Sequence, residues 1–151
     1  MASDLYETDY YLWTQAQAEA LRAAGKRARG SNAVEWERVA EEVEDMGKSE
    51  FDAALSLTVT ALEHLFKLAA QGRVEPHGHW RKEVRAARGN LKRKLTPTIR
   101  RKVEADLEAL HVEAAELAAD AFLTDEPDAS IPTERRWTLP QILGEAEDPL
   151  A

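Results

Sequence analysis

Apolar side chains recur every three to four residues along almost the whole chain, and this spacing constrains the fold more than any other feature. The recurrence covers five successive segments, residues 6–21, 36–46, 51–69, 80–91 and 99–121. A repeat near 3.6 residues places the apolar groups on one face of an α-helix, which is then buried against other helices. No segment alternates apolar and polar residues as a half-buried strand does. The sequence therefore predicts an all-α helical bundle of about five main helices plus a short C-terminal helix.

Residues that favour helix ends set the expected limits of these helices. Asp4 is a plausible cap for the first helix, and Gly47 is a typical stop for the second. Thr96 followed by Pro97 is a strong helix start, because proline fits the first helical position after a capping hydroxyl. The Gly89-Asn90 pair is a point at which the fourth helix can break.

The C-terminal part carries its own helix signal. Residues 124–136 are irregular and rich in Asp, Glu and Pro. After them, Thr138 and Gln141 fit a capping box, while Trp137 and Ile142 fit the hydrophobic staple that often accompanies one. We therefore expect a short terminal helix that docks on the bundle.

Length and composition bound the class of protein. With 151 residues the chain is expected to form one all-α domain over residues 1–151. The absence of cysteine excludes disulfides and thiolate chemistry and fits a reducing compartment. The opening MASDLYETDYYLW lacks the features of a signal peptide, and no apolar run reaches the length of a membrane span. The expected location is the cytoplasm, with no membrane partner.

Positive charge is concentrated in one segment. Residues 81–102 hold half of the lysines and arginines and only one acidic residue, Glu83. This segment carries a formal charge of +9, so the rest of the chain carries −17 to give the overall −8. Such a separation creates a strong local field and requires an anionic group against the segment, inside or outside the protein.

Three kinds of anion fit this requirement, and the sequence leaves the choice open. The favoured interpretation is internal pairing: the acidic helix around residues 35–45, or the acidic flank of the helix after it, is expected to lie within reach of some of Arg81, Arg85, Arg88 and Lys92. The alternatives are an acidic protein partner and the phosphates of a nucleic acid. The candidate anion- or partner-binding residues are Arg81, Arg85, Arg88, Lys92, Arg100 and Arg101.

Histidine motifs offer weaker chemistry. His77 and His79 form an HxH, Glu108 and His111 form a single Glu-x-x-His, and a carboxylate-bridged two-metal site needs two such motifs. The Arg73-x(5)-His79 spacing resembles that of a superfamily of helical ribonucleases. Phosphate loops, dinucleotide fingerprints and nucleophile elbows are absent from the sequence. We therefore assign no catalytic, metal or cofactor residue and expect no cofactor, and the balance favours a protein that is not an enzyme.

The first helix carries more apolar groups than one face can hold. Tyr6, Tyr10, Tyr11, Leu12 and Trp13 spread around more than one side of it. A core on a single side leaves some of them exposed, and an exposed apolar patch often marks an interface. The sequence thus predicts a homodimer.

Several clusters together are similar to a bacterial family of domains of unknown function, the one numbered twenty-nine. The resemblance runs from LYETDYYLWTQAQAEALR through WERVAEEVEDMGKSE, LEHLFKL and HWRKEVRAARGNL to WTLPQIL. Two departures are Lys67-Leu68, where members often have Lys-Trp, and Arg135-Arg136, where members often have Cys-Pro. The resemblance implies a small all-α bacterial protein and no particular activity.

These observations favour a non-enzymatic interaction or self-associating module. The alternative is a nucleic-acid-binding protein that uses residues 81–102, with a ribonuclease-like activity as its sharpest form. A helical bundle supports both.

Overall fold

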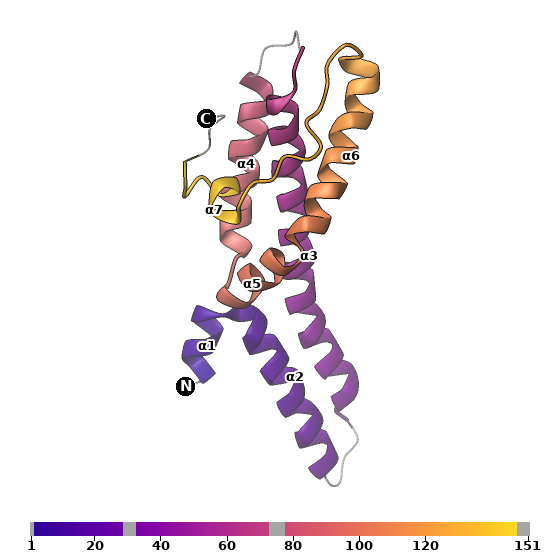
Figure 1. Ribbon diagram of the computed structural model, residues 1–151. Helices are drawn as coiled ribbons and strands as arrows, with labels where there is room; N and C mark the ends of the chain where they lie inside the picture. The colour runs from indigo at the N-terminus through magenta and orange to yellow at the C-terminus, as the bar shows by residue number, and fades with distance from the viewer. Residues whose placement is uncertain (1, 29–32, 73–77, 148–151) are drawn as a thin grey trace.

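The computed structural model describes residues 2–28, 33–72 and 78–147, and the chain forms seven helices there (Figure 1). They are α1 (Ala2–Thr8), α2 (Tyr10–Arg27), α3 (Trp36–Ala69), α4 (Gly78–Lys94), α5 (Pro97–Ala105), α6 (Leu107–Asp125) and α7 (Leu139–Ile142). Within the described ranges, β-type pairing is limited to one antiparallel bridge between Gln71 and Ser130. The predicted all-α class is confirmed.

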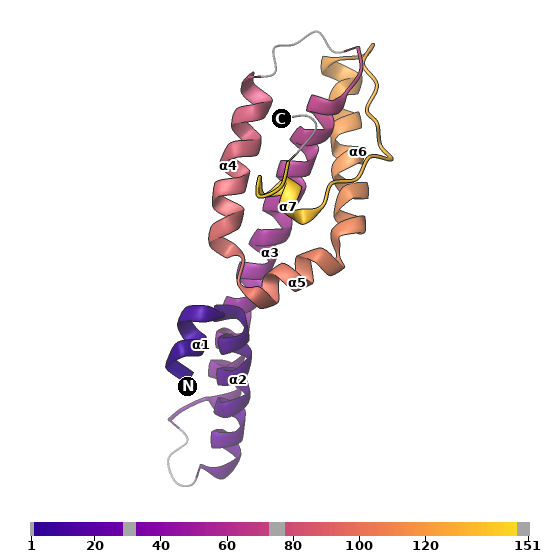
Figure 2. The ribbon, with the colours of Figure 1, turned by 60° about the vertical axis from the view of Figure 1, so that its left-hand side comes forward.

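Helix α3 is the shared spine of an elongated molecule (Figures 1 and 2). Its first half, up to Glu50, packs antiparallel to α2, and the short α1 folds back beside α2; we call these elements the hairpin. Its second half packs with α4 and α6, and α5 and α7 complete what we call the body. With 34 residues at 1.5 Å rise each, α3 is about 51 Å long.

The predicted stop at Gly47 is wrong, because the helix continues through it. Gly47 is buried where α2 crosses α3, and a Cβ added there would overlap the Thr14 hydroxyl. The glycine therefore allows α2 and α3 to approach closely, and it does not end a helix. The predicted second and third helices are accordingly one helix, α3.

Two predicted helices are instead interrupted. The predicted first helix divides at Asp9, which leaves the helical conformation with φ −153° and caps α2. The predicted fifth helix divides at Asp106, where α5 ends and α6 begins. The Gly89-Asn90 pair does not break α4. The start at Thr96-Pro97 and the capping box of Thr138 and Gln141 are both confirmed.

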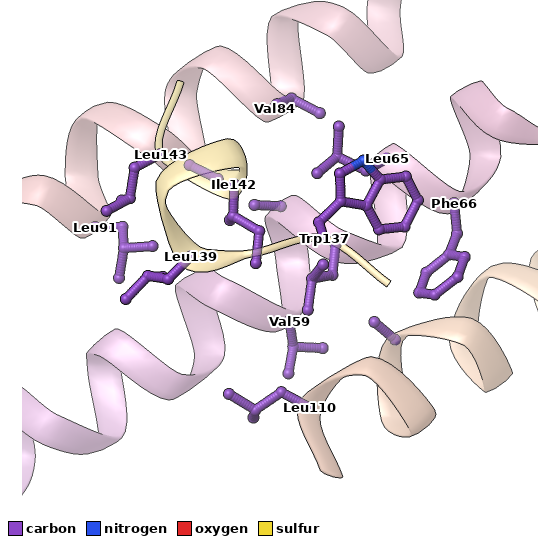
Figure 3. Close-up of a cluster of buried hydrophobic side chains, with 14 of the residues drawn as sticks. Val59, Leu65, Phe66, Val84, Leu91, Leu110, Trp137, Leu139, Ile142 and Leu143 are labelled. Atoms are coloured by element: carbon purple, nitrogen blue, oxygen red, sulfur yellow. The ribbon is translucent and has the colours of Figure 1, made fainter. Parts of the chain in front are cut away.

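The core lies in the body and includes the C-terminal segment (Figure 3). Phe66 from α3, Leu91 from α4 and Leu110 from α6 surround the side chains that α7 and its flanks insert between the helices. These are Trp137, Leu139, Ile142 and Leu143, all nearly or fully buried. The predicted docking of the terminal helix is therefore observed.

The Asp9 carboxylate bridges the hairpin and the body at their junction, which we call the waist. Asp9 accepts a hydrogen bond from the Leu12 N–H of α2 at 3.1 Å. Its other oxygen accepts from the Thr98 N–H at 2.9 Å and the Thr98 hydroxyl at 2.7 Å, in the first turn of α5. Asp9 thus caps two helices at once. Burial alone would raise the pKa of Asp9, but the hydrogen bonds from Thr98 and Leu12 outweigh it and lower the pKa.

Candidate interaction surfaces

The cations of residues 81–102 divide into an inward and an outward group. In the inward group, Lys94 pairs with Glu50 at 3.0 Å and Arg100 pairs with Glu145 at 2.9 Å. Lys102 lies over the rings of Tyr11 and Phe51, at 5.5 and 5.0 Å from their centroids. These contacts tie α4 and α5 to the hairpin and to the residues after α7. Part of the +9 charge is therefore compensated within the chain.

Arg88, predicted as a member of the binding stripe, has a structural role instead. Its guanidinium donates to the carbonyl oxygens of Ile142 at 2.6 Å and Gln141 at 3.1 Å. These are carbonyls at the end of α7, where a cation also meets the negative end of the helix dipole. Two residues after Ile142, Gly144 has φ +74° and lies against the Arg88 side chain. Arg88 thus holds α7 on the body.

The outward group forms an exposed surface, which we call the basic face of α4. It consists of Arg81, Lys82, Arg85, Lys92 and Arg93. Within the described residues, none of the five takes part in an ion pair or a side-chain hydrogen bond. Between them, Gly89 is open, and a Cβ added there would meet nothing within 4 Å.

Of the six candidate residues from the sequence, Arg81, Arg85 and Lys92 lie on this basic face. Arg88 and Arg100 are used inside the chain. Arg101 is exposed on α5, and it donates to the Thr98 hydroxyl at 3.2 Å.

Among the described residues, none of Arg81, Arg85, Arg88 and Lys92 forms an ion pair with the acidic residues 35–45, so the predicted pairing is not observed there. In the hairpin, the acidic residues Glu37 and Glu44 of α3 bind Arg22 of α2, at 2.9 and 2.8 Å. The hydrogen bond that Glu44 accepts from Arg22 lowers the pKa of Glu44, and the hydrogen bonds that Arg22 donates to Glu44 and Glu37 raise the pKa of Arg22. The physical reason is the continuity of α3, which carries its acidic half away from α4 and alongside α2.

The hairpin has a charged flank and an apolar flank. Glu37 and Glu44 are seven residues apart, so they lie on one stripe of α3, on the flank bridged by Arg22. The apolar flank carries Val39, Val43 and Met46 on α3, with Tyr10 and Leu21 on α2. Val39 is 41% exposed and Met46 46% exposed. The hairpin therefore presents apolar side chains that its own helices do not cover.

An aromatic cluster continues this flank at the waist. The rings of Tyr6, Tyr10 and Trp13 contact one another, with centroids 4.8 to 5.8 Å apart. Tyr6 of α1 is 47% exposed, while Tyr10 and Trp13 are half-buried. The predicted spread of apolar groups beyond one face of the first helix is thus observed, even though the helix divides at Asp9.

The Glu-x-x-His motif has a structural role. His111 is buried, and its Nδ1–H donates to the Leu107 carbonyl at 2.8 Å. Its Nε2 accepts from the Trp137 N–H at 2.9 Å, so the ring is neutral. Burial lowers the pKa of His111, and nearby Arg136 lowers it further against the opposing effects of the Leu107 bond and Glu108. Glu108 holds Arg136 through two hydrogen bonds of 2.9 Å.

The structure gives no support for a metal or catalytic site at the other histidine motifs. His77 and Arg73 lie outside the described residues, and His79 is exposed in the first turn of α4. His64 is largely buried, with Nδ1 2.8 Å from the Thr60 carbonyl. In the described part of the chain, no three His, Asp or Glu side chains are placed to hold a metal ion.

Sequence reasoning missed two of the residues that organise these surfaces. Asp9 was overlooked because Asp4 offers an equally good local capping signal. Arg22 was overlooked because its partners are 15 and 22 residues away. One signal for Arg22 was available, since an arginine on one helix is a natural partner for the acidic side chains of the next helix along the chain.

Comparisons with known proteins agree with this architecture. The chain is similar to an α-helical protein of unknown function from Rhodospirillum rubrum, whose crystal structure matches with a TM-score of 0.81 at 27% sequence identity. The match covers 95% of this chain and 91% of that one. No curated protein matches the sequence. Within the described residues, no helix is both long and apolar enough to cross a membrane. Residues 5–146 match the family described as "Domain of unknown function DUF29", and the chain belongs to that family.

Proposed function

We propose that this protein is a non-enzymatic interaction module that forms a homodimer through the apolar flank of its hairpin. The observation that carries the proposal is the exposure of Val39 and Met46 beside the aromatic cluster. A hairpin of two helices has no second layer over its flank, and helical folds normally bury such a flank against further helices. A second copy of the chain supplies those helices.

The hydrophobic effect favours burying the apolar flank of the hairpin. Burying a side chain such as Val or Met fully is worth about 1.5–3 kcal/mol relative to exposure. Val39 and Met46 are each a little under half exposed, so both retain part of this gain. In a symmetric dimer each contact occurs twice, which doubles the stabilisation.

The non-enzymatic part of the proposal rests on how the candidate catalytic groups are used. Both ring nitrogens of His111 bind backbone groups, and Glu108 is bound by Arg136. Groups held in this way position the C-terminal segment and leave no free acid or base at that site. We further propose a bacterial, cytoplasmic protein. Its relative from R. rubrum supports the bacterial source, and the lack of cysteine supports a reducing compartment.

Sedimentation of the full chain over a range of concentrations tests the homodimer. We expect the wild type to sediment as a dimer and the variant Val39→Gln with Met46→Gln to sediment as a monomer of unchanged helical content. The control is Leu123→Gln, because Leu123 is 76% exposed and belongs to the last turn of α6, at the end of that helix that points away from the hairpin (Figure 1). A wild type that stays monomeric at all concentrations would refute the proposal.

A further inference from the structure

We propose that each hairpin in the dimer packs on the basic face of α4 of the second copy, so that the contact occurs twice around one two-fold axis. This inference rests on the proposed homodimer and names the surface that covers the hairpin. The elements that meet are the basic face of α4 and an outward stripe that we call the α3 stripe, made of Glu35, which directly precedes α3, and Val39, Glu42 and Met46 of α3.

Charge favours this arrangement over hairpin against hairpin. Residues 1–50 contain eleven acidic residues and six lysines and arginines. Two such hairpins face to face would place like charges together, whereas α4 offers five exposed cations. Within the described residues none of the five is in an ion pair or a side-chain hydrogen bond, although Lys92 is close enough to Glu145 to lower the pKa of that carboxyl. On the α3 stripe, Glu42 is exposed and takes part in no ion pair among the described residues, and Glu35 meets only Arg38, at 3.8 Å.

The two stripes also match in spacing and length. Glu35, Val39, Glu42 and Met46 follow the i, i+4, i+7, i+11 pattern, and so do Arg81, Arg85, Arg88 and Lys92, with Arg88 turned to α7. Each stripe spans eleven residue steps, so both are about 17 Å long. Gly89, open to solvent, allows a helix to approach α4 closely.

Contacts inside the chain show the chemistry that would hold the two copies together. Lys102 lies over Tyr11 and Phe51, and Arg135 lies over the Trp137 ring at 4.9 Å. Cations over aromatic faces are therefore used at two places in this protein. The cluster of Tyr6, Tyr10 and Trp13 offers further aromatic surface, and the apolar stems of Lys92 and Arg93 are suited to cover it.

The position of the two surfaces makes a reciprocal contact feasible. In both views α1 lies below α4, and in Figure 2 α2 also lies below it, on the same side of the molecule (Figures 1 and 2). The Lys94–Glu50 pair fixes the lower end of α4 at the upper end of the apolar flank. A two-fold axis at the waist then places each hairpin alongside α4 of the other copy, because residue i contacting j implies j contacting i.

A charge exchange between two variants tests this contact. One variant carries Arg81→Glu and Arg85→Glu, and the other carries Glu35→Lys and Glu42→Lys. We expect each variant alone to dimerise at least about 100-fold more weakly than the wild type, since opposed like charges cost several kcal/mol. We expect an equimolar mixture to regain dimers, seen as a heterodimer by sedimentation and native mass spectrometry.

The control variant is Glu19→Lys with Glu41→Lys, which makes the same charge change on the flank bridged by Arg22. It should dimerise like the wild type. If the wild type dimerises but either charge-reversed variant does so equally well, or the mixture stays monomeric, the α4 contact is refuted while the homodimer stands. If the Arg81→Glu, Arg85→Glu variant instead loses a steeply salt-dependent binding to DNA and still dimerises, the basic face belongs to nucleic acid and the inference fails. A monomeric wild type overturns both.

Discussion

Two glycines in the middle of long helices should respond to alanine with opposite sign. Gly47 lies in α3 and Gly89 in α4, and in an ordinary helix alanine is favoured over glycine by about 1 kcal/mol. At Gly89 nothing lies within 4 Å of an added Cβ, so Gly89→Ala should gain this amount. At Gly47 the added Cβ would overlap the Thr14 hydroxyl and lie 3.2 Å from the Thr14 Cβ.

The magnitude at Gly47 follows from these two opposing effects. Overpacking a tight contact typically costs about 1–3 kcal/mol. Helices α2 and α3 must then separate, or the Thr14 side chain must leave its 2.6 Å hydrogen bond to the Tyr11 carbonyl. The helix gain of about 1 kcal/mol offsets part of this cost, so Gly47→Ala should leave a net destabilisation of up to about 2 kcal/mol.

Thermal and urea unfolding at one fixed protein concentration measure the difference. For a chain of this size, 1 kcal/mol shifts Tm by about 2–4 °C, so Gly89→Ala should unfold higher and Gly47→Ala lower than the wild type. Thr14→Ala removes the hydroxyl that the new methyl would meet, so the double variant should cost less than the sum of its parts. Stabilisation by Gly47→Ala, or additive effects in the double variant, would show that the close crossing of α2 and α3 does not limit this position.

Two further outcomes concern single ionisable groups. Asp9→Ala should destabilise by about 2 kcal/mol, roughly twice the cost of Thr138→Ala, since Asp9 caps two helices and Thr138 caps one; equal costs in urea unfolding would contradict this. The folded-state pKa of His111 is lowered, so its unfolded state binds the proton more readily and stability should fall as the pH drops below about 6.5. His111→Gln keeps one donor and one acceptor and should flatten this part of the pH–stability profile, and an unchanged profile would exclude His111 as its source.

Local signals in the sequence were read correctly where neighbouring residues decide the outcome. The capping box of Thr138 and Gln141 is complete within four residues, and the start at Thr96-Pro97 depends on adjacent residues. The same holds for the helical class, because it follows from repeats within each segment. Such features need no knowledge of the tertiary structure.

Other features depend on distant residues, so local reading failed there. From its neighbours alone, Gly47 looks like a helix stop. Its contact with Thr14, far away in the sequence, shows that the glycine allows α2 and α3 to cross closely. In the sequence, Arg88 looks like one member of a uniform basic stripe. In the fold, its guanidinium binds a carbonyl of α7, more than fifty residues later in the chain. The charge pattern predicted that anionic groups lie against residues 81–102. Only the fold shows which of these cations are paired within the chain and which form the exposed basic face of α4.

The continuity of α3 has a consequence for dividing the molecule. Cutting the chain near Glu50 would sever a helix in its middle, remove Glu50 from Lys94 and leave the first turn of α5 without the Asp9 carboxylate. A fragment of residues 1–50 would also lose the second half of the helix on which its own helical order partly depends. The hairpin is therefore not a transferable part. A binding experiment with such a fragment would therefore measure a partly unfolded peptide. Point substitutions in the intact chain are better suited to locate the residues that contact a partner.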